Sequence, residues 1–284
     1  MTVLEVIQRS SEFLARKGVE SPRLQIELLL AHVLQVPRLK LYLNFERRLT
    51  DAELDVLRAL VTRRGEREPL QHILGSVSFC GLELEVNREV LIPRPETELL
   101  AERACEYLAR LDSSAPIILD FGTGSGCLAI VLAVRFPAAQ VHALETSEAA
   151  LAVARRNADR HQVGARIQFH HGPDLAALSA GLQFDLLVSN PPYIPSGEIA
   201  ALQPEVRDHD PRPALDGGPD GLKFFRLLAT EAAGRMTPGG CAMLEFGDGQ
   251  GEAVSDIFSQ QGWRIEALEK DYSGRARILI ARRP

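Results

Sequence analysis

Apolar residues in the first quarter of the chain recur with the spacing of amphipathic helices. Residues 2–66 keep a rhythm of about 3.6 residues, which places one apolar face on each helix. The expected helix starts carry capping residues: Thr2 with Glu5, Thr50 with Glu53, and Ser21 directly before Pro22. This pattern predicts a small bundle of helices.

After the bundle, the spacing of apolar residues changes from a helical one to a shorter one. Between Gly75 and Asn87, apolar residues alternate with polar ones around Gly81, which predicts a β-hairpin. The segment Leu91-Ile-Pro-Arg-Pro-Glu-Thr-Glu98 follows, where two prolines oppose a helix and the acidic residues after them favour the start of one.

From Ile117 onward, short apolar runs alternate with amphipathic segments. This alternation is typical of a mostly parallel sheet with helices on its faces. The runs predict seven strands: Ile117–Asp120, Val141–Glu145, Ile167–His170, Phe184–Ser189, Cys241–Phe246, Trp263–Leu268 and Arg277–Ala281. The last two strands are joined by the turn-forming segment Asp271-Tyr-Ser-Gly274, so we expect the sheet to end in an antiparallel pair.

The domain organisation follows from these patterns. We expect a helical domain over residues 1–74, a hairpin and linker over 75–95, and an α/β domain over 96–284. A length of 284 residues suits one large or two ordinary domains.

Composition and charge exclude several classes of protein. Apolar residues make up 45% of the chain and charged residues 25%, which argues against a disordered or collagen-like chain. Residues 1–80 carry 12 basic and 10 acidic side chains, and the remainder carries 20 and 28, so neither part is a basic nucleic-acid surface. No apolar run is long enough for a membrane span, and the first residues lack the apolar core of a secretion signal. We therefore expect a cytoplasmic protein without membrane contact.

The four cysteines lie far apart in the sequence. Cys80, Cys105, Cys127 and Cys241 form no C-x-x-C pair and have no histidine at a zinc-binding spacing. We expect reduced thiols, Cys127 and Cys241 in the core, and no metal site.

A glycine-rich loop follows the first predicted strand of the sheet. Asp120-Phe-Gly-Thr-Gly-Ser-Gly126 leads directly into a helical pattern, and its glycines allow a tight turn and close approach to a ligand. Glu145 ends the next strand, where an acidic residue can accept hydrogen bonds from ribose hydroxyls. Together they indicate a nucleoside cofactor. The G-x-G-x-G spacing disfavours a dinucleotide, and Asp120 either positions the loop and cofactor or only caps a turn.

A second motif follows the fourth predicted strand. Asn190-Pro-Pro-Tyr193 is a stiff loop at the same edge of the sheet, and its two prolines remove backbone donors while keeping carbonyl acceptors. The Asn190 side-chain oxygen and the Pro191 carbonyl can each accept one N–H of a planar NH₂ group, on which Tyr193 can pack. The motif therefore predicts a site for a planar nitrogen substrate.

The two motifs together resemble class I methyltransferases that use S-adenosylmethionine (AdoMet) to methylate planar nitrogens. Further stretches resemble the PrmC/HemK family of peptide chain release factor glutamine N5-methyltransferases, and the similarity runs from the first helix to Arg277. The stretches are Ser21–Leu30, Pro69–Gly75, Val90–Glu98, Pro204–Pro211 and Ala214–Gly218.

This resemblance implies a seven-stranded Rossmann-like fold, the first domain as a substrate-recognition domain, and methyl transfer from AdoMet to a release factor. The acceptor is the side-chain amide nitrogen of the glutamine in the Gly-Gly-Gln motif. By the family's pattern, AdoMet is bound by Gly122, Thr123, Gly124, Ser125, Gly126, Glu145, Asp174 and Leu175. The glutamine is held by the catalytic residues Asn190, Pro191, Pro192 and Tyr193, of which Asn190 also contacts AdoMet.

Two positions depart from the family's pattern. Glu145 stands where the family usually has aspartate, and this longer carboxylate should still reach the ribose hydroxyls. Asp174-Leu175 replaces an acid followed by an aromatic residue, so adenine contact there depends on an aliphatic side chain.

Other motifs and functions stay open. Asp208-His209-Asp210 fits a solvated loop that borders the substrate better than a metal site, and Arg94 either contacts the cofactor or pins the linker. Two alternative functions compete with release factor methylation: methylation of an exocyclic amine of DNA or RNA, which the charge distribution disfavours, and AdoMet binding without catalysis.

Overall fold

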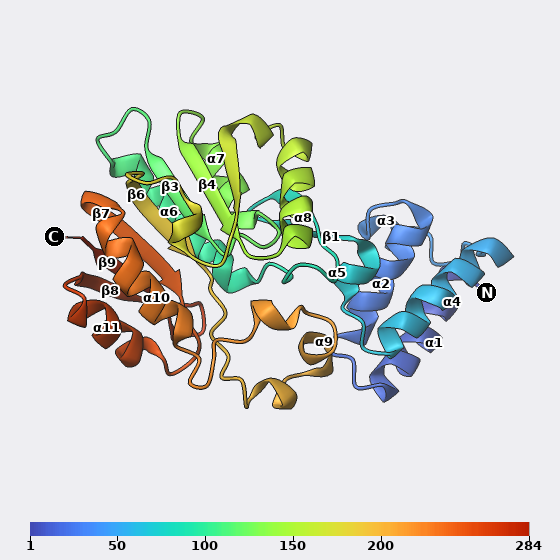
Figure 1. Cartoon of the computed structure of the whole chain (residues 1–284). Helices are drawn as coiled ribbons and strands as arrows, with labels where there is room; N and C mark the ends of the chain where they lie inside the picture. The colour runs from blue at the N-terminus through green and yellow to red at the C-terminus, as the bar shows by residue number, and fades with distance from the viewer. Residues whose placement is uncertain (284) are drawn as a thin grey trace. The chain divides into compact units, whose positions relative to one another are not determined.

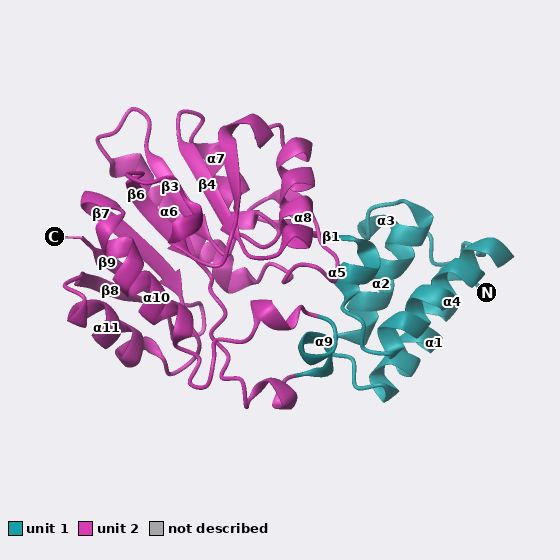
Figure 2. Ribbon diagram, viewed as in Figure 1, with its two compact units in different colours: residues 1–76, 203–209 teal, residues 77–202, 210–284 magenta. Residues whose placement is uncertain are grey.

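The computed structural model describes residues 1–283, which form two compact units (Figure 2). One unit contains residues 1–76 together with residues 203–209, and the other contains residues 77–202 and the chain from residue 210 onward. The predicted domain limits at residues 74 and 95 stay a prediction. The assignment of residues 203–209 to the N-terminal unit is a feature that the sequence pattern does not indicate.

The N-terminal unit is helical, as the apolar rhythm predicts. Its helices are α1 (Val3–Arg16), α2 (Pro22–Leu34), α3 (Leu39–Tyr42), α4 (Asp51–Gly65), α5 (Leu70–Leu74) and α9 (Pro204–Arg207) (Figure 1). Leucine, isoleucine and valine side chains of the first four helices form its core.

Both predicted capping boxes are present. The hydroxyls of Thr2 and Thr50 accept hydrogen bonds from the backbone N–H groups of Glu5 and Glu53, whose carboxylates bond back to the capping residues. Ser21 is the N-cap residue of α2 and Pro22 its first residue, as predicted, but the Ser21 side chain makes no capping hydrogen bond. Ser21 has the left-handed φ of 48°, whereas capping side chains are usually carried by residues with extended backbone angles.

Two arginines of the bundle hold residues 203–209 through Glu205. Arg64 and Arg67 each donate to its carboxylate, at 2.7 Å and 2.5 Å for the shortest contacts. Arg64 is only 3% exposed and also donates to the Gln25 side chain and the Glu68 carbonyl. Burial opposes the charge of Glu205, but the hydrogen bonds from Arg67 and Arg64 outweigh it and lower its pKa to about 2. This segment is therefore tied to the bundle by a charged cluster.

The hairpin and the linker precede the main sheet. Strands β1 (Ser76–Phe79) and β2 (Leu82–Glu85) form the predicted hairpin. Helix α6 (Pro95–Arg110) begins on the second proline of the linker, which the prediction places before the helix. A proline suits the first helical position because the N–H that it lacks has no partner within the helix there.

The larger unit contains a seven-stranded sheet in the order β5-β4-β3-β6-β7-β9-β8, which confirms the predicted class I methyltransferase arrangement. Its strands are β3 (Ile117–Phe121), β4 (Gln140–Glu145), β5 (Ile167–His171), β6 (Phe184–Ser189), β7 (Met236–Glu245), β8 (Arg264–Lys270) and β9 (Ala276–Arg282). All seven predicted strands are present. Only β9 runs against its neighbours, so the predicted antiparallel pair closes the sheet.

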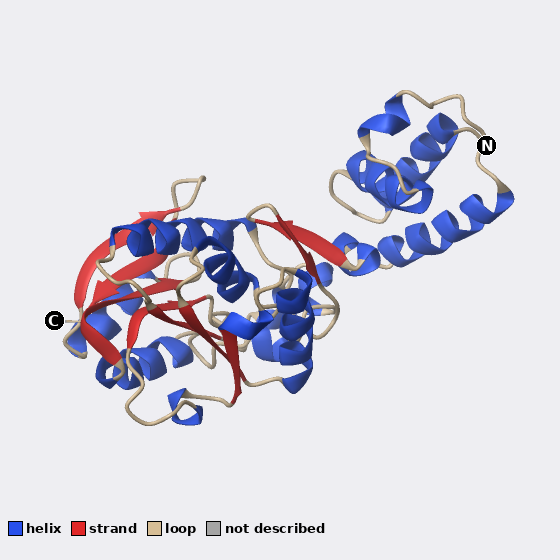
Figure 3. Cartoon of the chain, turned by 90° about the horizontal axis from the view of Figure 1, so that it is seen from above, coloured by secondary structure: helices blue, strands red, loops and turns tan. Residues whose placement is uncertain are grey.

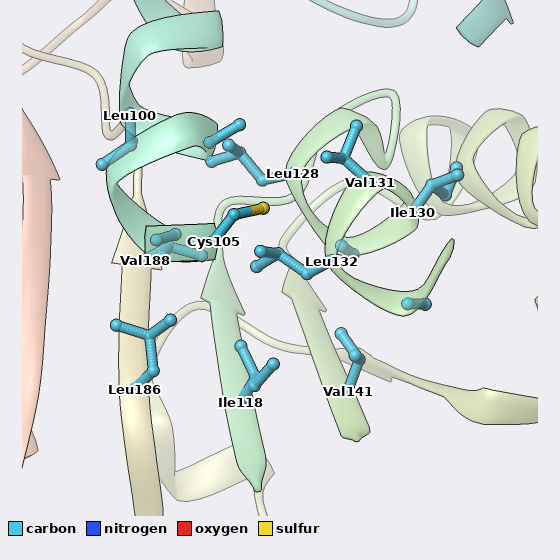
Figure 4. Close-up of a cluster of buried hydrophobic side chains, with 14 of the residues drawn as sticks. Leu100, Cys105, Ile118, Leu128, Ile130, Val131, Leu132, Val141, Leu186 and Val188 are labelled. Carbon is cyan, nitrogen blue, oxygen red and sulfur yellow. The ribbon is translucent and has the colours of Figure 1, made fainter. Parts of the chain in front are cut away.

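Helices cover both faces of this sheet (Figure 3). They are α6, α7 (Cys127–Arg135) and α8 (Glu148–Arg160) on one face, and α10 (Lys223–Glu231) and α11 (Gly251–Gln260) on the other. Figure 4 shows side chains of α6 and α7, such as Leu100 and Leu128, packed over Ile118 and Val188 of the strands. Burying one such side chain contributes about 1.5–3 kcal/mol, so these layers hold the strand ends in place.

Cys241 lies in this core as expected, whereas Cys127 is only partly buried and packs against it. All four cysteines are free, Cys241 is fully buried, and burial raises its pKa to about 12 and also raises the pKa of Cys127. Within residues 1–283, no helix has the length and hydropathy that crossing a membrane requires.

Candidate active site

A cavity lies where the sheet changes its direction of winding. From β3 the chain proceeds to β4 on one side, whereas β6 lies on the other side of β3 and leads on to β7. Ligands of open α/β sheets bind beyond the carboxyl ends of such strands. The ends of β3 and β6 are linked here because the Ser189 hydroxyl donates to the Phe121 carbonyl at 2.7 Å. The cavity measures about 290 Å³, at the lower end of the usual range for small-molecule sites.

The glycine loop forms one wall of this cavity. Gly122 and Gly124 line it, and both have a positive φ, at 71° and 54°. A Cβ at Gly122 would meet no atom within 4 Å, so the backbone here is open to a ligand. Gly126 is the N-cap residue of α7 and has a φ of 84°; a Cβ there would press against Ile130 and Ala154. Gly122 and Gly124 therefore allow a ligand to approach the backbone, and Gly126 allows α7 to pack closely.

Asp120 supports the loop from inside the protein. One oxygen of its carboxylate accepts from the Thr123 hydroxyl at 2.6 Å and from the Ala129 backbone N–H at 3.1 Å. Asp120 and Thr123 are buried, as is Ser125. Burial raises the pKa of Asp120 to about 7, although the two hydrogen bonds counteract this effect. These bonds hold the loop and the first turn of α7, which agrees with both predicted roles of Asp120.

Glu145 lies at the end of β4 and lines the cavity. Its two oxygens accept backbone N–H bonds from Gly124 at 3.0 Å, Thr146 at 2.8 Å and Ser147 at 3.0 Å. Two carboxylate oxygens offer about four acceptor positions, so an acceptor remains for a hydroxyl group. Leu144, Ala150 and Pro173 provide an apolar surface beside it. A carboxylate next to an apolar slot suits the ribose and base of a nucleoside.

Asn190 faces this cavity from the end of β6. Asn190 and Pro192 line it, whereas Pro191 is buried. Tyr193 packs against the core formed with α10 and α11, and burial raises its pKa. Its carbonyl accepts from the Gln250 side chain at 2.9 Å, which fixes the loop after the motif. The structure therefore brings Asn190 and the glycine loop to one cavity.

Asp174 and Leu175, the expected AdoMet contacts, are not among the residues that line the cavity. Leu175 is 2% exposed and belongs to the core beside Leu144 and Phe184, while Asp174 caps a short turn by accepting from the Ala176 backbone N–H. The residues just before them, Gly172 and Pro173, line the cavity instead. Contact of Leu175 with adenine stays a prediction, and its burial in the core does not support it.

The loop around residue 210 borders the cavity. Pro211, Pro213 and Ala214 are lining residues. Arg94 donates to Asp210 at 2.5 Å, which favours the interpretation that Arg94 pins the linker. Asp210 is 6% exposed, so the expectation of a solvated loop is wrong at this residue, and burial raises its pKa to about 6 against the effect of Arg94. Asp208 is exposed and pairs with Arg207. No cluster of three metal-binding side chains occurs within residues 1–283.

Two polar residues behind Asn190 do not emerge from the sequence motifs. The Asn190 Nδ2 donates to the Thr97 hydroxyl at 3.0 Å, and that hydroxyl donates to Glu245 at 2.7 Å. Thr97 lies within a segment that carries the resemblance, but the pattern of that segment indicates no role for it. Glu245 directly follows the buried apolar run at residues 241–244, and an acid in this position is the one feature of the sequence that could have indicated a role for it. The apolar lining residues Val90, Leu91 and Phe224 give no comparable signal.

Two family models match the chain. The PrmC N-terminal domain matches residues 5–75, and the methyltransferase small domain matches residues 101–203. Together they cover the helical bundle and both motifs of the cavity.

Comparisons with known proteins agree with these matches. The release factor glutamine methyltransferase of Geobacter sulfurreducens is 46% identical to this chain, and the alignment covers 99% of this chain and 96% of the relative. That of Chlorobaculum tepidum is 48% identical, and the alignment covers 96% of this chain and 94% of the relative. Among solved structures, a methyltransferase from Pyrococcus furiosus aligns with a TM-score of 0.54 at 20% identity, over 72% of this chain and 90% of that one. A 16S rRNA methyltransferase of T. thermophilus in complex with AdoMet and guanosine aligns with a TM-score of 0.52 at 20% identity, over 74% and 50%. The two structures establish the fold, and the sequence relatives establish that the chain belongs to the release factor glutamine methyltransferase family.

Proposed function

We propose that this protein transfers the methyl group of AdoMet to the side-chain amide nitrogen of the glutamine in the Gly-Gly-Gln motif of bacterial class I peptide chain release factors. The observation that carries the proposal is that one cavity is lined both by the glycine loop with Glu145 and by Asn190. In a member of this family, this arrangement supports a cofactor subsite next to an acceptor for a planar nitrogen.

We assign AdoMet to the part of the cavity between the glycine loop and β4. Gly122 and Gly124 would let the ligand approach the backbone, and Glu145 would bind the ribose. Thr123, Ser125 and Gly126 would act by shaping the loop, since the first two are buried and the third is the N-cap residue of α7. When bound, AdoMet supplies a methyl group on a positively charged sulfur, which keeps the electron pair of the broken S–C bond.

The protein's own task is to present the acceptor nitrogen. An amide nitrogen is a weak nucleophile because its lone pair is shared with the carbonyl group. Asn190 Oδ1 and the Pro191 carbonyl would accept its two N–H bonds and turn its remaining face toward the methyl group, with Pro192 and Tyr193 keeping the loop stiff. These acceptors would also stabilise the positive charge that grows on nitrogen as the N–C bond forms. Water can then take the released proton.

Recognition of the release factor requires a larger surface than a glutamine side chain provides. We propose that the N-terminal bundle supplies it. Leu39 and Leu43, in and just after the short helix α3, are 73% and 84% exposed, and such apolar residues in one short segment are typical of protein interfaces. The substrate being a protein of translation, we also infer a cytoplasmic location and no direct contact with nucleic acid.

Incubation with methyl-labelled AdoMet and separate acceptors tests this function. Purified release factor should become labelled, whereas a DNA duplex and an RNA hairpin should not. Asn190→Ala should bind AdoMet and lose at least about a hundredfold in turnover, because misplacement of a nucleophile alone can cost this much. Labelling of nucleic acid in place of release factor would favour the alternative acceptor, and AdoMet binding without any transfer would indicate a binding module.

A further inference from the structure

A line of hydrogen bonds runs from Asn190 into the protein. Asn190 Nδ2 donates to Thr97 Oγ1 at 3.0 Å, and Thr97 Oγ1 lies 2.7 Å from Glu245 Oε2. Thr97 and Glu245 are each 2% exposed. Thr97 belongs to the first turn of α6 and Glu245 to the end of β7, so both side chains are held by packed elements. The line connects a cavity residue with a buried acid.

The chemistry of this line determines which end of the Asn190 amide faces the cavity. An ionised carboxylate can only accept hydrogen bonds, so the single hydroxyl proton of Thr97 must go to Glu245. The Thr97 oxygen can then only accept, which requires the NH₂ end of Asn190. The oxygen and nitrogen ends of an asparagine have nearly the same shape, so packing alone does not select between them.

We propose that Thr97 and Glu245 are positioning residues that hold the Asn190 amide with its Oδ1 free for the acceptor nitrogen. This inference rests on the proposed function, in which the acceptor is a planar NH₂ group. Such a group brings N–H donors and needs an acceptor oxygen opposite them. A flipped Asn190 would present a second donor and would repel the acceptor nitrogen.

The charge of Glu245 sets the direction of the line. Burial raises the pKa of Glu245 to about 7, opposed by its hydrogen bonds to Thr97 and Tyr193. The charged groups that face it are Glu96 from α6, which also raises this pKa, and Arg277 from β9, which lowers it. A protonated Glu245 can itself donate to the Thr97 oxygen, which frees the Thr97 hydroxyl proton. Thr97 can then either donate to the oxygen end of the Asn190 amide or accept from its NH₂ end. Turnover should therefore fall as the pH drops through about 7.

Substitutions at Thr97 separate the roles of its shape and its hydroxyl. Thr97→Val keeps the shape and removes the hydroxyl, whereas the matched control Thr97→Ser keeps the hydroxyl. We expect the valine variant to lose at least about tenfold in kcat on release factor, because the free energy of one hydrogen bond corresponds to a factor of this size. Its AdoMet affinity should stay within about twofold of the wild-type value. Its kcat should no longer fall below pH 7. The serine variant should retain most of the wild-type kcat and its acidic decline.

Glu245→Gln provides a second variant, because glutamine cannot be protonated in this range but keeps an oxygen for Thr97. Its kcat should also lose the decline below pH 7. Wild-type activity of Thr97→Val, or an unchanged acidic decline in Thr97→Val or in Glu245→Gln, would overturn the positioning role. A parallel loss of AdoMet binding and thermal stability in the valine variant would show a structural role instead. Wild-type enzyme that does not methylate release factor would refute the proposed function itself, a separate outcome.

Discussion

Gly124 is the residue at which a single substitution most directly tests the cofactor subsite. Its φ of 54° strains any side chain, and its position in the cavity wall places a side chain against a ligand. We expect Gly124→Val to weaken AdoMet binding at least about tenfold, or roughly 1.4 kcal/mol, in titration calorimetry.

Gly262 offers a matched control for backbone strain. It has a φ of 80°, a Cβ added there would meet no atom within 4 Å, and it does not line the cavity. Gly262→Val should lower thermal stability without changing AdoMet affinity. If Gly124→Val and Gly262→Val bind AdoMet with equal affinity, the assignment of the AdoMet site to the glycine loop is wrong.

At the scale of elements, ion pairs of Glu205 with Arg64 and Arg67 connect α9 to the rest of the N-terminal unit. The pKa of Glu205 is about 2, below its ordinary value of 4.5, so its ionisation stabilises the fold above pH 4.5 and this contribution disappears as the pH falls toward 2. Glu205→Gln should reduce the free energy of unfolding at pH 7 by about 1.5–3 kcal/mol, the scale of hydrogen bonds to charged groups.

Urea denaturation at a series of pH values measures this effect. The difference between wild type and Glu205→Gln should shrink as the pH falls below 4.5, and the exposed Glu198→Gln should show no comparable difference. A difference that stays constant down to acidic pH would show that shape, and not charge, holds the segment.

The elements also show how far sequence reasoning reaches. The strands in the middle of the sheet, β3, β4 and β6, could be predicted because each is a mostly buried apolar run. The edge strand β8 could be predicted from its alternation of apolar and polar residues. The start of β7 at Met236 could not, because Thr237-Pro-Gly-Gly240 has the composition of a turn, and its pairing with β6 shifts register there. The glycine loop and Asn190 follow strand ends, so their meeting at one edge followed from topology. Thr97 and Glu245 are 148 residues apart in the sequence, and only the packing of α6 on β7 brings them together.

At the scale of the whole molecule, substitutions should be able to weaken recognition of the release factor without affecting AdoMet binding or methyl transfer. Replacing Leu39 and Leu43 by serine should reduce kcat/KM for intact release factor by about tenfold or more, since burial of one leucine contributes about 1.5–3 kcal/mol. AdoMet affinity and activity on a short Gly-Gly-Gln peptide should not change.

Tyr272→Ser is the matched control, because Tyr272 is 82% exposed and belongs to the larger unit. It should leave kcat/KM for the release factor unchanged. These point variants are preferable to deletion of residues 1–66, which would also remove Arg64 and leave Glu205 without that partner. Full activity of the double serine variant on intact release factor would place the docking surface elsewhere.

The central claim is that the methyl group goes to one glutamine side chain of the release factor. Tandem mass spectrometry of a protease digest, after incubation of release factor with the enzyme and AdoMet, identifies the modified atom group directly. The account predicts that the Gly-Gly-Gln peptide gains the mass of one methylene group on the glutamine side chain, and that the gain is absent with Asn190→Ala. A methyl group on any other residue, or an unmodified Gly-Gly-Gln peptide after complete reaction with active enzyme, would contradict it.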